Sequence, residues 1–144
     1  MSYLKALMLS KYSKREVVTI PTPIIEFDNK IKNNKLELIL LNNSDIKLDM
    51  KIGKILIIVN EVLTNDRIIY IPSATNIINN LNLENGNYFN FIINNNQSGN
   101  YSIILDLGNN VNLHHTSSPI INKNSKAKYI GFVEQNNIVL YQKY

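Results

Sequence analysis

Few side chains in this sequence could carry catalysis or bind a metal. The 144 residues contain eleven acids, two histidines and no cysteine. Catalysis by side chains needs a base beside a nucleophile or a pair of placed carboxylates, and no spacing here provides either. The two histidines are adjacent, at His114 and His115. Neighbours in a β-strand point to opposite faces, so we expect that these two do not bind one metal within a single chain.

A histidine can still meet its own copies in an assembly. On a three-fold axis, His114 or His115 would bring three imidazoles together as a metal site or a pH-sensitive contact. The common catalytic and phosphate-binding motifs GxGxxG, GxxxxGK[ST], GxSxG and HExxH do not occur in the sequence. We therefore expect no enzyme, no catalytic residue, no cofactor and no metal site within one chain.

The charge pattern argues against a nucleic-acid partner. The formal net charge is +4, but the densest basic stretch is only Lys11 to Arg15 and the other lysines are scattered. Binding along a phosphate backbone needs a stripe of cations. Residues 1–10 have too short an apolar stretch for a signal peptide, and no run approaches the roughly 18 apolar residues of a membrane span. We expect neither a nucleic-acid partner nor a membrane span.

The elements that must position any site are short strands. Runs of Ile, Leu, Val, Tyr and Phe alternate with clusters of Asn, Gly, Ser and Asp, and no long helical period interrupts them. Turn chemistry lies at Asn85–Gly86, at residues 98–100 and at residues 108–110. The pattern predicts an all-β fold, an antiparallel β-sandwich or jelly roll. The expected strands are 24–27, 36–41, 45–51, 54–60, 67–71, 88–94, 101–107, 111–115, 127–133 and 137–142.

One short helix is expected near 73–81, because Ser73 can cap it and Ile77, Ile78 and Leu81 form an apolar side. Residues 1–23 contain two prolines and a basic patch, which predicts an extended N-terminal arm or, equally, an edge strand. Residues 24–144 are expected to form one β domain. The many asparagines, roughly two dozen, accompany as many isoleucines and are weak evidence for a ligand.

The order of features from Arg67 to Tyr144 carries a resemblance. Arg67–Ala74 precedes the expected helix, and Tyr88–Asn94, Gly108–Leu113, Ala127–Val133 and Ile138–Tyr141 follow in turn. This succession resembles the trimeric β head domains of virion surface and fibre proteins, which are jelly rolls similar to tumour-necrosis-factor trimers. Where that pattern has two glycines before its valine, this chain has Gly108 followed by two asparagines, which loosens the match at the turn.

The resemblance implies a non-enzymatic structural or host-attachment protein on a virus particle. It would be a homotrimer, made in the host cytoplasm and located in the virion, with the N-terminal arm bound to virion or capsid proteins. Host glycans or a receptor would be its outer partners. The alternative is a small carbohydrate-binding β-sandwich module, with ligand loops at Asn95, Asn96, Asn109 and Asn110.

The sequence itself suggests where copies would meet. The later strands carry large apolar groups on both faces, so one face can serve the core while the other needs a partner. Gly131 inside a strand indicates a bulge or a close backbone approach, which an axial contact would use. The expected oligomer interface consists of Tyr88, Ile92, Tyr129, Gly131, Val133 and Tyr141.

Overall fold

The computed structural model describes residues 16–19 and 35–144. The expected strand at 24–27 and most of the arm expected at 1–23 lie outside these ranges. The elements in chain order are β1 (Glu16–Thr19), β2 (Lys35–Leu41), β3 (Ile46–Lys47), β4 (Lys54–Val59), β5 (Arg67–Ile71), α3 (Ala74–Leu81), β6 (Tyr88–Asn95), β7 (Ile103–Leu107), β8 (Val111–Leu113), β9 (Ile120–Ile121), β10 (Ser125–Glu134) and β11 (Asn137–Gln142).

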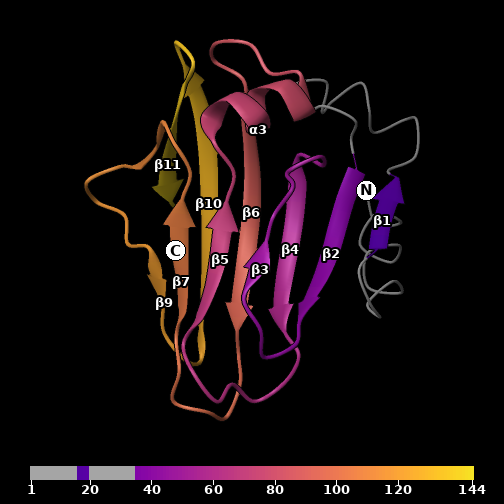
Figure 1. Ribbon diagram of the computed structural model, residues 1–144, viewed down its shortest axis with the longest axis vertical. Coiled ribbons are helices and arrows are strands. Elements are labelled where there is room, and N and C mark those ends of the chain that lie inside the picture. The colour runs from indigo at the N-terminus through magenta and orange to yellow at the C-terminus, as the bar shows by residue number, and fades with distance from the viewer. Residues whose placement is uncertain (1–15, 20–34) are drawn as a thin grey trace.

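Two sheets make up most of the described structure. The larger has seven strands in the order β1-β2-β4-β6-β10-β11-β8, and the smaller has four in the order β3-β5-β7-β9. Figure 1 shows the smaller sheet in front of the larger one, with α3 across one end. The predicted β-sandwich and the short helix near 73–81 are therefore confirmed, and β1 lies at the edge of the larger sheet.

The prediction of antiparallel sheets is wrong, because both sheets are mixed. Parallel pairs join β2 to β4, β4 to β6, β3 to β5, β5 to β7 and β8 to β11. From β2 to β10 successive strands alternate between the two sheets. Each return to the same sheet up to β7 restores the original strand direction, so β2, β4 and β6 run parallel, as do β3, β5 and β7. The return from β7 through β8 to β9 reverses the direction, and β7 and β9 pair antiparallel.

The turns explain why the sequence wrongly predicted antiparallel sheets. The residues at 98–100 connect β6 to β7, and those at 108–110 connect β7 to β8. Both connections cross between the sheets and close no hairpin. The turn between β10 and β11 does close an antiparallel hairpin, and there Gln135 and Asn136 both have positive φ, at 50° and 68°. Turn residues show that the chain reverses, but they do not show which sheet it joins next.

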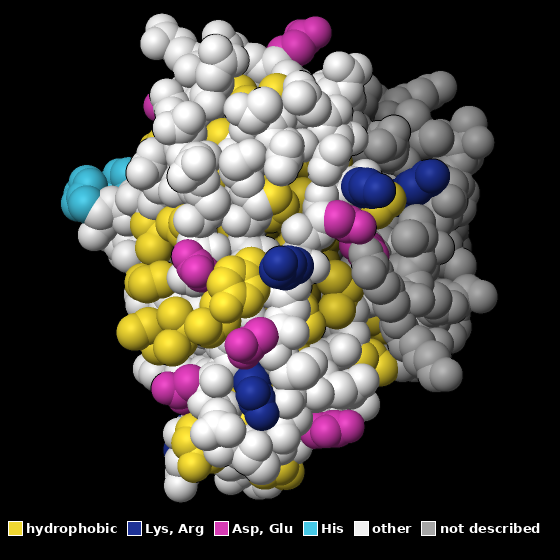
Figure 2. All heavy atoms as spheres, in the orientation of Figure 1, with side chains coloured by type: hydrophobic (Ala, Val, Ile, Leu, Met, Phe, Trp, Pro, Cys, Tyr) yellow, Lys and Arg dark blue, Asp and Glu magenta, His cyan; other side chains and the backbone are white. Residues whose placement is uncertain are grey.

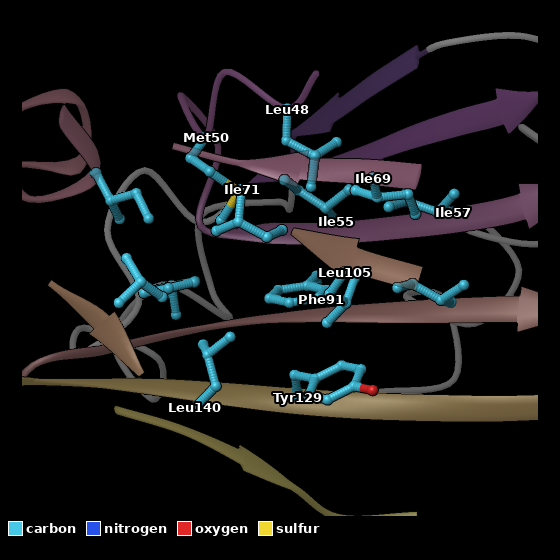
Figure 3. Close-up of a cluster of buried hydrophobic side chains, with 14 of the residues drawn as sticks. Leu48, Met50, Ile55, Ile57, Ile69, Ile71, Phe91, Leu105, Tyr129 and Leu140 are labelled. Carbon is cyan, nitrogen blue, oxygen red and sulfur yellow. The ribbon is translucent and has the colours of Figure 1, made fainter. Parts of the chain in front are cut away.

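The core fills the space between the sheets with aliphatic and aromatic side chains (Figure 3). Strand β6 shows the rule: Phe89, Phe91 and Ile93 are buried, and the residues between them are half-buried. Phe91 stacks between Phe89 and Tyr129, with ring centroids 6.4 Å and 5.1 Å apart. Ile and Val fit such a pleated, buried surface because their branched side chains pack well against neighbours.

Helix α3 forms where the sequence predicts a short helix, and it lies across one end of the sandwich (Figure 1). Ser73 caps it: its hydroxyl oxygen accepts a hydrogen bond from the amide of Asn76 at 3.2 Å. Ala74, Ile77 and Leu81 are buried. The helix ends at Asn82, which adopts the left-handed conformation with φ of 53°.

Candidate assembly face on the seven-stranded sheet

The side of the larger sheet that points away from the core carries a group of large apolar residues. On β6 these are Tyr88 and Ile92, which alternate with Asn90 and Asn94, and on β10 they are Ile130 and Phe132. The four apolar side chains are half-buried. Side chains alternate along a strand, so these residues lie between the core residues in sequence and point to the opposite face of the sheet. Apolar residues on both faces of β6 and β10 are thus observed, as the sequence indicated.

Strand register brings these side chains together across the sheet. Leu56 of β4 pairs with Ile92, and Tyr88 pairs with Phe132. Phe132 in turn pairs with Val139, while Ile130 pairs with Tyr141. We call this set the assembly face. Its members are Leu56, Ile58, Tyr88, Ile92, Ile130, Phe132, Val139 and Tyr141.

Aromatic rings line one side of the assembly face. The ring centroids of Tyr88 and Phe132 are 5.9 Å apart, and Phe132 meets Tyr141 edge-on at 5.6 Å. Tyr141 stacks on His114 at 4.5 Å, and His114 lies 4.1 Å from His115. Aromatic residues supply large contact areas at low cost in side-chain entropy, which suits them to binding surfaces.

The middle of the face is hollowed, with a volume of about 520 Å³. Leu56, Ile92 and Ile130 are among the side chains that line it. Lys54 and Lys128 also line the hollow, from the strands on either side of β6. An acid, Glu134, lies at one end of β10 and is exposed. The face is therefore mostly apolar at its centre, where Asn90 is the polar exception, with a lysine on either side and an acid at one end.

The predicted oligomer-interface residues fall on two different sides of the sheet. Tyr88, Ile92 and Tyr141 belong to the assembly face. Tyr129 and Val133 are buried in the core, at 0% and 3% exposure, and Gly131 is buried between them. These three are enclosed by the protein's own sheets, so their placement at an outer surface is corrected.

The sequence held a signal that could have separated the two sides of β10. Lys126 and Lys128 alternate with Ala127 and Tyr129, and a lysine marks the wet side of a strand. Gly131 lies on the same buried side of β10 as Ala127 and Tyr129. A methyl carbon at Gly131 would lie 2.4 Å from the Phe89 ring, so the close approach predicted for this glycine is to a core aromatic ring. The ladder is continuous through Gly131, so no bulge forms there.

The four asparagines expected in ligand loops do not form one site. Asn95 is fully buried, and its amide nitrogen donates hydrogen bonds to the carbonyls of Tyr101 and Ile121 at 3.2 Å and 3.0 Å. Asn96 is exposed beside it. Asn109 and Asn110 are exposed in the turn after β7, at the opposite end of the sandwich (Figure 1). Asn95 thus has a structural role.

The two histidines lie in a turn that follows β8, so the expectation of opposite strand faces does not apply. The backbone turns after Leu113, and the amide of Ser117 donates to the carbonyl of His114 at 2.9 Å. His114 Nδ1 lies 2.7 Å from the hydroxyl of Thr116. Within residues 16–19 and 35–144, no three side chains of His, Asp or Glu gather as a metal site would require.

The smaller sheet has a less apolar outer surface. Ile68, Ile104 and Ile120 lie side by side across three strands. Figure 2 shows charged side chains beside and below the apolar patch on this surface, and Lys47 and Asp106 flank Tyr70 in the strand register. The larger sheet therefore offers the better candidate for a self-assembly surface.

Comparison with known proteins found no match: no protein-family model, no curated protein and no solved structure is significantly similar to this chain. None of the helical structure in residues 16–19 and 35–144 is long and apolar enough to cross a membrane.

Proposed function

We propose that this chain is a non-enzymatic structural or attachment protein of a virus particle, and that it assembles as a homotrimer through the assembly face. The observation that carries the proposal is the band of half-buried aromatic and aliphatic side chains across β4, β6, β10 and β11. Contiguous apolar surfaces of this kind mark interaction sites, because burying them releases roughly 25 cal/mol per Å².

The resemblance to jelly-roll heads similar to tumour necrosis factor supports the proposal only through the order of sequence features. Strand directions give it no support, since five of the strand pairs are parallel. The proposal therefore depends on the surface and not on the topology.

Two lysines flank the centre of the face that a closed ring would bury. A three-fold ring joins one patch of each copy to a different patch of the next, so the two contacting surfaces need not be the same. Lys54 and Lys128 on one copy would then face a different surface of its neighbour. In this arrangement residues 1–23 connect the trimer to virion or capsid proteins.

The test is the mass of the full chain in solution, measured by sedimentation velocity and light scattering over a range of concentrations. We expect a trimer that resists dilution, because a specific interface buries about 800 Å² on each partner. Ile130→Lys places a charge in the middle of the assembly face and should convert the trimer to a monomer.

Ile104→Lys is the matched control. Ile104 is also half-buried on an outer sheet surface, but it lies on the smaller sheet, so this variant should remain trimeric. Circular dichroism and thermal unfolding would check that both variants fold. A wild-type chain that stays monomeric at high concentration would contradict the proposal, and so would an Ile130→Lys variant that remains a trimer.

A further inference from the structure

A second hollow, of about 780 Å³, lies beside the acidic end of the assembly face. It is formed by the loop after α3, strand β8 and the hairpin turn between β10 and β11; the loop and the turn lie at the same end of the sandwich in Figure 1. We call this second hollow the polar hollow. The polar side chains that line it are Asn85, Asn112, Glu134, Gln135 and Asn137.

The backbone around the polar hollow is held in place by hydrogen bonds. Asn85 Oδ1 accepts from the amide of Gln135 at 2.9 Å, and the amide of Gly86 donates to the carbonyl of Val133 at 3.0 Å. Asn137 Nδ2 donates to the carbonyl of Gln135 at 3.3 Å. Glu134 and Asn137 are the closing pair of the hairpin. The two loops are thus fixed relative to one another before any ligand binds.

Several polar groups of the hollow have no partner among the described residues. The side chains of Asn112, Glu134 and Gln135 form no hydrogen bond or ion pair with any of them. With the same part of the chain, the amide nitrogen of Asn85 and the amide oxygen of Asn137 form no hydrogen bond either. The hollow therefore offers amide donors, amide acceptors and one carboxylate acceptor within one concave surface.

This set of groups selects against charged ligands. The described residues that line the hollow include no lysine, arginine or histidine that would bind an anion. A single carboxylate provides little negative charge for a divalent cation, which is usually held by several carboxylates and carbonyls. A neutral ligand with closely spaced hydroxyls fits better, because each hydroxyl can donate to a carboxylate or amide oxygen and accept from an amide N–H.

An apolar wall adjoins these polar groups. Val133 and Val139 both line the hollow. Sugars combine hydroxyls with an apolar C–H face, and that face packs against aliphatic side chains. We propose that the polar hollow is a binding site for a neutral glycan.

The site deepens the proposed attachment role, on which its biological meaning rests. It shares Val139 with the edge of the assembly face, but its polar groups lie on the loop after α3, on β8 and at the hairpin turn, outside the central hollow. Glycan can therefore bind there while the central hollow contacts another copy. Glycan binding and trimer formation are measured separately, by ligand titration and by sedimentation. A failure of one therefore does not imply a failure of the other.

The experiment titrates the full ¹⁵N-labelled chain with lactose, mannobiose and diacetylchitobiose, and follows the side-chain amide signals by nuclear magnetic resonance. We expect at least one of the three to shift the Asn112 and Gln135 amide signals, with a Kd on the order of 1 mM, as suits a few hydrogen bonds. Glu134→Ala and Asn112→Ala should each weaken that binding about tenfold or more.

Asn65→Ala is the matched control. Asn65 is also exposed and without a hydrogen bond to any described residue, but it lies in the β4–β5 connection at the opposite end of the sandwich, so this variant should bind as the wild type does. The proposal is overturned if none of the three sugars shifts these signals. It is also overturned if binding survives Glu134→Ala and Asn112→Ala in chains that unfold at the wild-type temperature. A chain that binds only 3′-sialyllactose, and loses it on Lys128→Ala, would likewise reject a neutral-glycan site.

Discussion

Replacing Gly131 with alanine would force a methyl group into the ring of Phe89. A Cβ atom at Gly131 would lie 2.4 Å from Phe89 Cζ and 2.5 Å from Cε1, and real Cβ contacts essentially never fall below 3.0 Å. The ring has little room to move, because Phe89 is 1% exposed and stacks on Phe91. Such overpacking costs about 1–3 kcal/mol.

Urea and thermal unfolding would measure this cost. At about 2–4 °C per kcal/mol for a chain of this size, the melting temperature of Gly131→Ala should fall by roughly 2–12 °C. Phe89→Leu removes the obstructing ring atoms. We therefore expect the double variant to be more stable than the sum of the single effects predicts, with a coupling energy of about 0.5–3 kcal/mol.

Gly86→Ala provides the control for this cycle. Gly86 has a φ of +83° and no neighbouring atom within 4 Å of an added Cβ, so alanine there strains only the backbone. Its effect should be additive with that of Phe89→Leu. If Gly131→Ala is as stable as the wild type, or if its effect is also additive with Phe89→Leu, the packing argument for β10 is refuted.

Three further changes test the structure elsewhere. Burial raises the pKa of Tyr129 from 10.0 to about 12, so the folded state keeps the phenol proton longer than the unfolded state does. The free energy of unfolding should therefore be unaffected by Tyr129 below pH 10 and should fall by about 2–3 kcal/mol as the pH rises to 12. Urea unfolding at each pH should show this fall in the wild type and not in Tyr129→Phe. Asn95→Ala removes the side-chain donor to the Ile121 carbonyl, while the Tyr101 carbonyl keeps its hydrogen bond from Gln97; the change should cost about 1–3 kcal/mol in chemical unfolding, whereas Asn96→Ala should cost almost nothing. Ser73→Ala removes the cap of α3 and should lower stability by about 1 kcal/mol, with Ser73→Asp close to wild type in the same assay.

Much of the local structure could be read from the sequence alone. The alternation in Tyr88–Asn94 correctly separated buried from half-buried residues on β6, because that period is a property of the strand itself. Ser73 and the apolar residues that follow it also located α3 correctly, because the capping hydrogen bond joins residues only three positions apart. The asparagines also acquire a local explanation: Asn43, Asn82, Asn110, Asn124 and Asn136 all have positive φ, which asparagine tolerates better than most residues.

The tertiary structure decided the rest. The turns at 98–100 and 108–110 were located correctly, but only the packed sandwich shows that they carry the chain to the other sheet. The buried side of β10 depended on Phe89 covering Gly131, a contact between residues 42 positions apart. The polar hollow likewise joins Asn85, Asn112 and Glu134 from separate segments. Turn and strand preferences act over a few neighbouring residues, whereas sheet membership and the assembly of a site follow from which distant surfaces pack together.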